Sequence, residues 1–278
     1  MLVNGKKMLD IARDNHTVVY QFNINNLEWT RIILEKCNEM GVPVILGASE
    51  GAIRYMGGYH VVASMVRAMI LDLGIENDVC LHLDHGSSFD SCVKAIDAGF
   101  TSVMIDASKL EIDENIKETK KVVDYAKRFN VTVEAEIGHV GGMEDDVKST
   151  ILLADYNDCI RFVNETGIDF LAPAIGTVHG IYKGELNIDY DLIEKLRKSL
   201  NVPLVMHGGS GLDHNILKKA ILCGISKINI NSDMQATWHD AVVEFIKNNP
   251  DVYDPRKVIM AGADAMKEFI EEKINILK

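Results

Sequence analysis

Short runs of apolar and β-branched residues recur along this chain, and segments with a helical pattern separate them. Most runs are nearly continuous in apolar residues, as expected for parallel strands that are buried on both faces. Eight such runs lie at residues 18–23, 42–49, 79–86, 101–108, 131–138, 169–176, 202–209 and 226–231. This alternation predicts an α/β chain folded as a (β/α)8 TIM barrel, and favours it over an open doubly wound sheet.

The helical signals and the connections define the expected domain organisation. Residues 27–40, 88–99, 114–130 and 192–201 carry helical patterns. Because no Pro/Ser-rich linker divides the chain, we expect one barrel domain over residues 1–278, with additional C-terminal helices at about 234–278. The connections 138–157 and 176–190 are too long for simple turns. In a barrel, such loops usually carry function.

Charge and cysteine content exclude several classes of protein. The formal net charge is −12, which argues against a surface that neutralises nucleic-acid phosphates. No apolar run approaches the ~18 residues of a membrane span. The 5 cysteines are scattered without CxxC pairs, which suits reduced thiols in the cytoplasm. We therefore expect a cytoplasmic protein without nucleic-acid or membrane partners.

Three histidines stand at the ends of apolar stretches that are far apart in the sequence: His85, His179 and His207. In a parallel barrel the carboxyl ends of all strands meet at one mouth. Three imidazoles that converge there would form a catalytic zinc site, which typically has three protein ligands and one open position. The sequence therefore predicts that these histidines bind Zn²⁺.

Asp84 directly precedes His85, and Gly86 follows. Successive strand residues point to opposite faces, so both side chains reach the mouth only if the backbone turns at the strand end. On this interpretation Asp84 is a proton-transfer group beside the metal ligand. The alternative is an ordinary Asp-His-Gly turn. His82 is expected to be a core or supporting histidine.

Glu134 and Glu136 share one face of an apolar strand. Two buried carboxylates are costly without a cation or hydrogen-bond donors. Glu136, nearer the strand end, is a candidate fourth or alternating metal ligand, and Glu134 is expected to support it or to bind a second ion. The alternative is a pair that is satisfied by Lys or Arg from neighbouring strands.

Two polar loops follow the last two predicted strands, where barrels often bind phosphate. Glycine-rich backbone before a helix can approach an anion closely. The residues concerned are Gly208, Gly209, Ser210 and Gly211, then Asn229, Asn231 and Ser232, with Gly180 and Lys183 from an earlier loop. The loop 138–150 contains Glu144, a candidate general base on a lid. The alternative for the two polar loops is that they are only turns. The alternative for Lys183 is a solvated loop lysine, and the alternative for the loop 138–150 is a solvated acidic loop.

Taken together, these motifs resemble the class II, zinc-dependent ketose-bisphosphate aldolases, and within them the bacterial fructose-1,6-bisphosphate enzymes. The segments are LHLDHGSS, VEAEIG with GGMEDD, LAPAIGTVHG with YKG, HGGSG, ININ with SD, and YDPRK. The resemblance extends from QFNINN at residues 21–26 to YDPRK at 253–257. Tagatose-bisphosphate aldolases share most of these motifs, and Asn231 replaces an Asp found in some fructose-specific members.

The resemblance implies a role for each matching position. It assigns zinc to the three histidines, with Glu136 joining the metal in part of the family, and assigns acid/base catalysis at the C4 hydroxyl to Asp84. Glu144 would handle the donor-carbon proton. The glycine, serine and asparagine positions of the two loops would bind the dihydroxyacetone phosphate half. Asn23 and Ser49 would lie near the other end, and Arg256 would contact the second phosphate across a subunit boundary.

The reaction implied is the reversible cleavage of fructose-1,6-bisphosphate to dihydroxyacetone phosphate and glyceraldehyde 3-phosphate, in glycolysis and gluconeogenesis, through an enediolate stabilised by zinc. A monovalent cation (Na⁺ or K⁺) and a homodimer or homotetramer are also implied. Four alternatives stay open: a tagatose-1,6-bisphosphate aldolase, a Schiff-base aldolase, a zinc-dependent hydrolase of a phosphorylated metabolite, and a phosphosugar-binding protein without activity. A Schiff-base aldolase needs a desolvated lysine at the end of a strand, whereas Lys227 lies at the start of the eighth apolar run. This position disfavours the Schiff-base mechanism.

Overall fold

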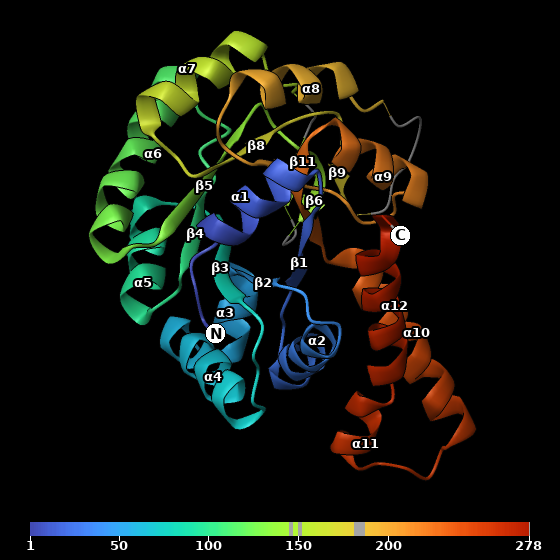
Figure 1. Cartoon of the computed structure of the whole chain (residues 1–278). Helices are drawn as coiled ribbons and strands as arrows, with labels where there is room; N and C mark the ends of the chain where they lie inside the picture. Colours follow the sequence, from blue (N-terminus) through green and yellow to red (C-terminus); the bar gives the residue numbers. More distant parts are fainter. Residues whose placement is uncertain (145–146, 150–151, 181–186, 278) are drawn as a thin grey trace.

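The computed structural model describes residues 1–144, 147–149, 152–180 and 187–277. Eight parallel strands form a closed barrel in the order β1-β11-β10-β8-β5-β4-β3-β2 (Figure 1). The strands are β1 (Val19–Asn23), β2 (Val44–Ser49), β3 (Val79–Gly86), β4 (Ser102–Ile105), β5 (Thr132–Ile137), β8 (Phe170–Pro173), β10 (Leu204–Met206) and β11 (Ile225–Ile230). Each lies within or next to one of the predicted runs, so the (β/α)8 prediction is confirmed.

Helices cover the outside of the barrel, and sequence signals mark where many of them begin. They are α2 (Leu27–Glu39), α3 (Glu50–Met56), α4 (Tyr59–Asp72), α5 (Phe89–Ala98), α6 (Ile112–Ala126), α7 (Tyr156–Thr166), α8 (Tyr190–Ser199) and α9 (His214–Cys223), with a 3₁₀ turn at Lys127–Phe129. Asn26 accepts a hydrogen bond from Trp29 N and so begins α2. Ser88 and Ser91 form a capping box at α5. The large core lies between these helices and the strands.

Helix α1 (Lys6–Asn15) precedes the first strand and closes the amino end of the barrel (Figure 1). Met8, Leu9 and Ala12 of α1 pack in a separate apolar cluster with inward-facing strand residues such as Phe170 and Val205. The barrel interior is therefore apolar at this end. Polar side chains of the strands occupy the next level, toward the carboxyl ends.

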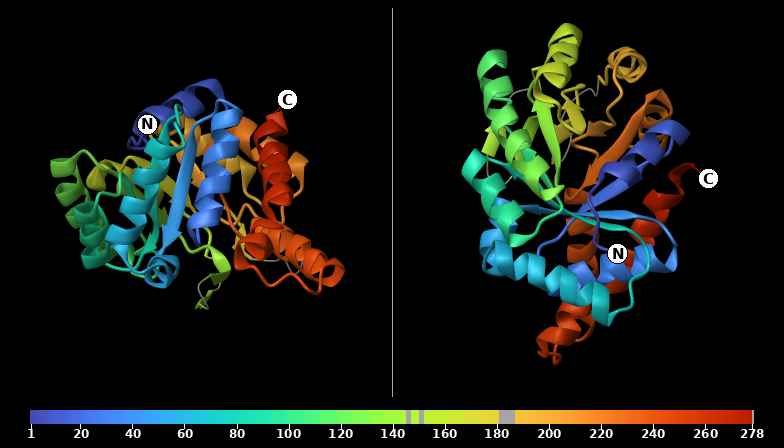
Figure 2. Two further views of the ribbon diagram at one scale, coloured as in Figure 1. Left: turned by 90° about the horizontal axis from the view of Figure 1, so that it is seen from below. Right: turned by 60° about the vertical axis from the view of Figure 1, so that its left-hand side comes forward.

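The C-terminal region folds as helices. They are α10 (Ser232–Asn248), α11 (Pro255–Met260) and α12 (Ala263–Ile274), followed by a 3₁₀ turn at Asn275–Leu277. Helix α12 packs on α2, where Lys36 Nζ lies 2.7 Å from Glu271 Oε2. The distal end of α10 and all of α11 extend away from the barrel (Figure 2).

A second, smaller sheet was not expected from the sequence. It pairs β6 (Gly141–Glu144) with β7 (Val147–Ser149) on one side and with β9 (Val178–His179) on the other. Both long connections that we singled out contribute to this sheet. Among the described residues, no helix is long and apolar enough to cross a membrane.

Candidate active site at the carboxyl end of the barrel

The backbone turns at His85 and brings two adjacent side chains to the same mouth. His85 has φ +49°, a value that L-residues seldom adopt, and the β3–β4 register shifts between Leu83 and Gly86. Asp84 consequently lines the central cavity, while the ring of His85 faces His179 and His207. The ordinary-turn alternative does not account for this arrangement.

The three predicted histidines converge. Ligand nitrogens of His85, His179 and His207 all lie within 4.8 Å of one another. The ring centroids of His85 and His207 are 4.6 Å apart, and those of His85 and His179 are 5.1 Å apart. His207 directly follows β10, whereas His179 lies on β9, beyond the end of β8. The small sheet, and not a barrel strand, therefore positions the second histidine.

Carboxylates form a second group that shares His85. Ligand atoms of His85, Asp106 and Glu136 also lie within 4.8 Å of one another. Glu136 accepts a hydrogen bond from Val140 N at 3.1 Å through Oε1, while its Oε2 is buried without a partner among the described residues. A buried carboxylate oxygen without a donor carries a free-energy cost that a cation offsets. Imidazole nitrogens with a carboxylate are also ligands that zinc takes, so these residues fit the implied metal.

Asp106 orients His85 and was missed by sequence reasoning. Its Oδ2 lies 3.1 Å from His85 Nδ1, and its Oδ1 accepts a hydrogen bond from Ser108. Burial alone would raise the pKa of Asp106, but the hydrogen bonds from His85 and Ser108 outweigh it and lower that pKa. Asp106 follows β4 directly, so the strand-end rule that found His85 would also have found Asp106.

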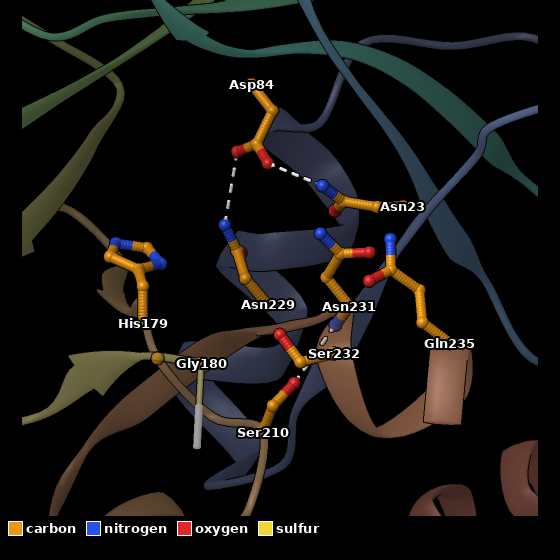
Figure 3. A pocket seen from close by; sticks show the side chains of 10 residues that line it. Asn23, Asp84, His179, Gly180, Ser210, Asn229, Asn231, Ser232 and Gln235 are labelled. Carbon is orange, nitrogen blue, oxygen red and sulfur yellow. Dashed lines mark hydrogen bonds between the residues drawn. The ribbon is translucent and has the colours of Figure 1, made fainter. Parts of the chain in front are cut away.

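Asp84 is held as a carboxylate by two amides (Figure 3). Asn23 Nδ2 donates to Asp84 Oδ2 at 2.9 Å, and Asn229 Nδ2 donates to Oδ1 at 3.2 Å. Burial would raise the pKa of Asp84, but the nearby histidines His85 and His207, with Lys227, lower it below the usual range of an aspartate. The side chain is therefore ionised at neutral pH and can accept a proton.

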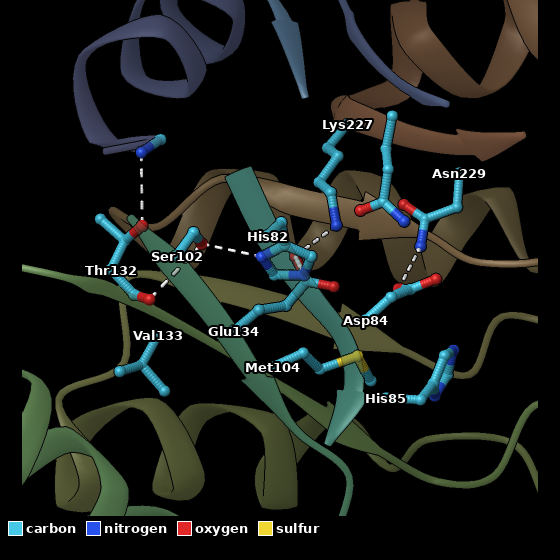
Figure 4. Close-up of polar contacts among 12 residues, drawn as sticks. His82, Asp84, His85, Ser102, Met104, Thr132, Val133, Glu134, Lys227 and Asn229 are labelled. Atoms are coloured by element: carbon cyan, nitrogen blue, oxygen red, sulfur yellow. Dashed lines mark hydrogen bonds and ion pairs between the residues drawn. The ribbon is translucent and has the colours of Figure 1, made fainter. Parts of the chain in front are cut away.

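Glu134, on β5, is fully buried and is contacted by neighbouring side chains, among them Lys227 (Figure 4). Lys227 Nζ lies 2.6 Å from Glu134 Oε2, and His207 Nε2 lies 2.9 Å from Oε1. Burial would raise the pKa of Glu134, but Lys227 and His207 lower it. Glu134 belongs to neither metal-competent group of the described residues, so the arrangement favours the alternative in which a neighbouring lysine satisfies it.

His82 is a core histidine, as expected. It is 1% exposed, and its Nδ1 lies 2.8 Å from Ser102 Oγ. Burial and the nearby Lys227 lower the pKa of His82 to about 3, so the ring is neutral.

The cavity at this mouth is lined almost wholly by neutral polar groups. Its lining comprises Asn23, Asp84, His179, Gly180, Gly208, Ser210, Asn229, Asn231, Ser232 and Gln235. Helix α10 begins here without a side-chain cap, so amides of its first turn are available to an anion. No lysine or arginine occurs among the described lining residues. Gln235, one turn into α10, was not anticipated, because nothing in the sequence distinguishes it from a solvated helix residue.

The remaining predicted residues lie off the cavity or outside the described residues. Gly211 N donates to Asp233 at 2.7 Å, and Gly209, like Gly211, does not line the cavity. Ser49 caps α3. The Arg256 side chain is 88% exposed and pairs with Asp254. Lys183 lies outside the described residues, and of Glu144 only its place in β6 is described.

Comparisons with known proteins identify the family of this chain. The family model described as "Fructose-bisphosphate aldolase class-II" matches residues 3–278. The chain is 50% identical over 274 residues to the fructose-bisphosphate aldolase of Geobacillus stearothermophilus, covering 98% of this chain and 96% of that protein. The same values hold for the fructose-bisphosphate aldolase of Staphylococcus aureus strain Mu50. The crystal structure of the YdjI aldolase from Escherichia coli K12 matches with a TM-score of 0.86 at 30% identity, covering 100% of this chain and 97% of that one. The chain belongs to the class II fructose-bisphosphate aldolase family.

Proposed function

We propose that this protein catalyses the reversible aldol cleavage of fructose-1,6-bisphosphate to dihydroxyacetone phosphate and glyceraldehyde 3-phosphate. The observation that carries the proposal is the ionised Asp84 beside three convergent histidines, in a cavity of neutral hydrogen-bonding groups. The names of the relatives at 50% identity support fructose bisphosphate as the substrate.

His85, His179 and His207 would hold a zinc ion, with Glu136 as a further ligand. Bound there, zinc would supply Lewis-acid polarisation of the substrate's C2 carbonyl. We propose no metal role for Glu134, because Lys227 and His207 occupy its oxygens.

Asp84 would take the proton of the C4 hydroxyl during cleavage and return it during condensation. Asn23 and Asn229 donate to its two oxygens and so keep the carboxylate aimed at the cavity. Glu144, on the β6 strand of the small sheet, would transfer the proton at the donor carbon. These two carboxylates then divide the two proton transfers of the reaction.

The dihydroxyacetone phosphate half would bind at Gly180, Gly208, Ser210, Asn231 and Ser232, where backbone and hydroxyl donors face the cavity. Because the described lining contains no lysine or arginine, the remaining phosphate charge needs cations from elsewhere. We assign them to Lys183, to a monovalent cation (Na⁺ or K⁺) and to Arg256 of a second copy. This assignment accompanies the proposal of a homodimer or homotetramer.

Two rival mechanisms fit the site less well. A Schiff-base aldolase requires an accessible lysine, but Lys227 is 1% exposed, bonded to Glu134 and absent from the cavity lining. A zinc hydrolase would use the same histidines, but the relatives at 50% identity carry the name fructose-bisphosphate aldolase, which supports carbon–carbon cleavage instead. We also propose that the protein is cytoplasmic, that it acts in glycolysis, and that the chain forms a single domain.

Purified protein depleted of metal tests this proposal directly. We expect no turnover of fructose-1,6-bisphosphate without metal, recovery with zinc or cobalt, and triose phosphates as the products. Tagatose-1,6-bisphosphate, assayed alongside, should give the lower kcat/KM. Full turnover after verified zinc depletion, or release of inorganic phosphate instead of triose phosphates, would contradict the proposal.

A further inference from the structure

A buried ion pair between Glu134 and Lys227 lies beneath the cavity and lines no part of it. We propose that this pair positions His207, by fixing the tautomer in which Nε2 carries the proton and Nδ1 is free to bind metal. The inference rests on the proposed function, because it concerns the same metal site. It makes Glu134 and Lys227 positioning residues that do not touch the substrate.

The argument begins at Lys227, which can only donate hydrogen bonds. Its Nζ lies 2.6 Å from Glu134 Oε2, and each of the two residues is at most 1% exposed. A buried ammonium group requires a charge partner, so the carboxylate of Glu134 stays an acceptor on both oxygens. Its other oxygen, Oε1, lies 2.9 Å from His207 Nε2. His207 Nε2 must therefore carry the proton that this hydrogen bond uses.

His82 cannot replace Lys227 as the partner of Glu134. Ser102 Oγ donates to Thr132 O, and so accepts a hydrogen bond from His82 Nδ1 at 2.8 Å. The proton of the neutral ring is thereby placed on Nδ1, and His82 Nε2 presents a lone pair, 3.8 Å from Glu134 Oε2. Among the described residues, Lys227 is the cation that contacts Glu134.

The consequence appears on the opposite edge of the His207 ring. Its Nδ1 lies 2.9 Å from His85 Nε2. Asp106 holds His85 in the same manner, because it lies 3.1 Å from His85 Nδ1. With both outer nitrogens protonated, the two inner nitrogens face each other as lone pairs. Both rings can then bind one cation through these nitrogens, and Asn229 Nδ2, which lies 3.5 Å from His207 Nδ1, can donate to that lone pair when no cation is bound.

The variant Glu134→Gln tests the inference because its amide has one donor end and one acceptor end. Lys227 can only donate, so it will select the amide oxygen and turn the NH₂ toward His207 Nε2. We expect the His207 proton to move to Nδ1 and zinc affinity to fall by about 10- to 100-fold. Long-range ¹H–¹⁵N NMR of the metal-free protein reads the tautomer, and chelator competition reads zinc affinity.

A second substitution should reverse the first. In Glu134→Gln/Lys227→Met the ammonium group is absent, so the amide can turn its oxygen to His207 and its NH₂ to the lone pair of His82. We expect the Nε2–H tautomer and most of the zinc affinity to return. A purely structural role predicts additive losses instead. Lys36→Met is the matched control: it removes a buried ammonium paired with Glu271 on the outside of the barrel, and zinc affinity should not change.

Measurements on the wild-type protein test the proposed function independently of this inference. Zinc binding and aldol cleavage by the wild type test the function, whatever the variants do. The positioning inference is overturned if Glu134→Gln binds zinc as tightly as wild type, or if the double variant is worse than the single one. If the variants do not fold, NMR of metal-free wild type still decides: an Nδ1–H tautomer at His207 refutes the inference, and an Nε2–H tautomer supports it.

Discussion

At the scale of single residues, the site depends on hydrogen bonds that assign each polar group one state. Asp84 receives two amide donors, His85 is held by Asp106, and His207 is held by Glu134. Each acceptor is a carboxylate with a lowered pKa. The protonation of the reactive groups is therefore set before any ligand binds.

Replacing Asp84 by Ala should separate catalysis from metal binding. Without the C4 proton acceptor we expect kcat for cleavage to fall by at least about 100-fold. Zinc content, measured by metal analysis, should stay at the wild-type level, because Asp84 belongs to neither metal-competent group of the described residues.

Glu144→Ala is the counterpart of that variant. Asp84→Ala should still exchange the donor-carbon proton of dihydroxyacetone phosphate with solvent, followed by NMR in D₂O, whereas Glu144→Ala should not. Loss of bound zinc from Asp84→Ala would reassign Asp84 to a structural role.

Residue types at strand ends predicted His85, Asp84, Glu136 and His207 as site residues, and the structure brings His85 close to His207 and to Glu136. The sequence could not decide what Glu134 does, because a buried carboxylate can be balanced by a metal or by a lysine. That choice depends on the barrel register, which places Lys227 of β11 opposite Glu134 of β5 across the interior. Gln235 could not be predicted as a cavity residue either, because it lines the cavity only as a result of where α10 begins.

At the scale of elements, the barrel strands were predictable and the small sheet was not. Continuous apolar runs identify buried parallel strands, whereas β6, β7 and β9 consist of glycine, polar and short apolar residues without a period. Helix α1 was not predicted, and α10 was expected only as part of the C-terminal helices from about residue 234. The missed sheet matters because its strand β9 carries His179 into the histidine cluster, and because β6, from a separate connection, pairs with β9.

The loop after β10 supports this sheet through Gly208. Gly208 has φ +68°, and a Cβ added there would lie 2.4 Å from Val178 O on β9. Gly208→Ala should therefore push β9 away, displace His179, and lower kcat/KM by about tenfold or more, equivalent to about 1.4 kcal/mol. Steady-state kinetics and zinc titration would measure both effects.

Gly41→Ala is the matched control for that substitution. Gly41 has a nearly equal φ of +65°, but a Cβ added there meets nothing within 4 Å. Both variants carry a similar backbone strain of about 1 kcal/mol. Only Gly208→Ala should lose activity; equal kinetics for the two would refute the role assigned to the contact with Val178.

At the scale of the whole molecule, barrel closure gathers ligands from distant parts of the chain. His85, His179 and His207 come from β3, from β9 and from the end of β10, and meet only in the folded state. The closed order of eight strands follows from eight similar segments, so the fold could be read from the sequence. The single-domain organisation stays a prediction.

Zinc should therefore stabilise the folded chain. A ligand present at 100 times its Kd adds about 2.7 kcal/mol to the free energy of unfolding. At about 2–4 °C per kcal/mol, we expect Tm to rise by about 5–11 °C. Differential scanning calorimetry of metal-free and zinc-loaded protein measures the shift. Magnesium should leave Tm unchanged and His179→Ala should reduce the zinc effect; an identical Tm with and without zinc would count against the site.

Helix α1 closes the amino end of the barrel with apolar side chains that pack in one buried cluster with Phe170 and Val205. The substrate must therefore enter, and both cleavage products must leave, through the mouth at the carboxyl end of the barrel. The two cleavage products share this one opening, so a product that still occupies it obstructs the departure of the other.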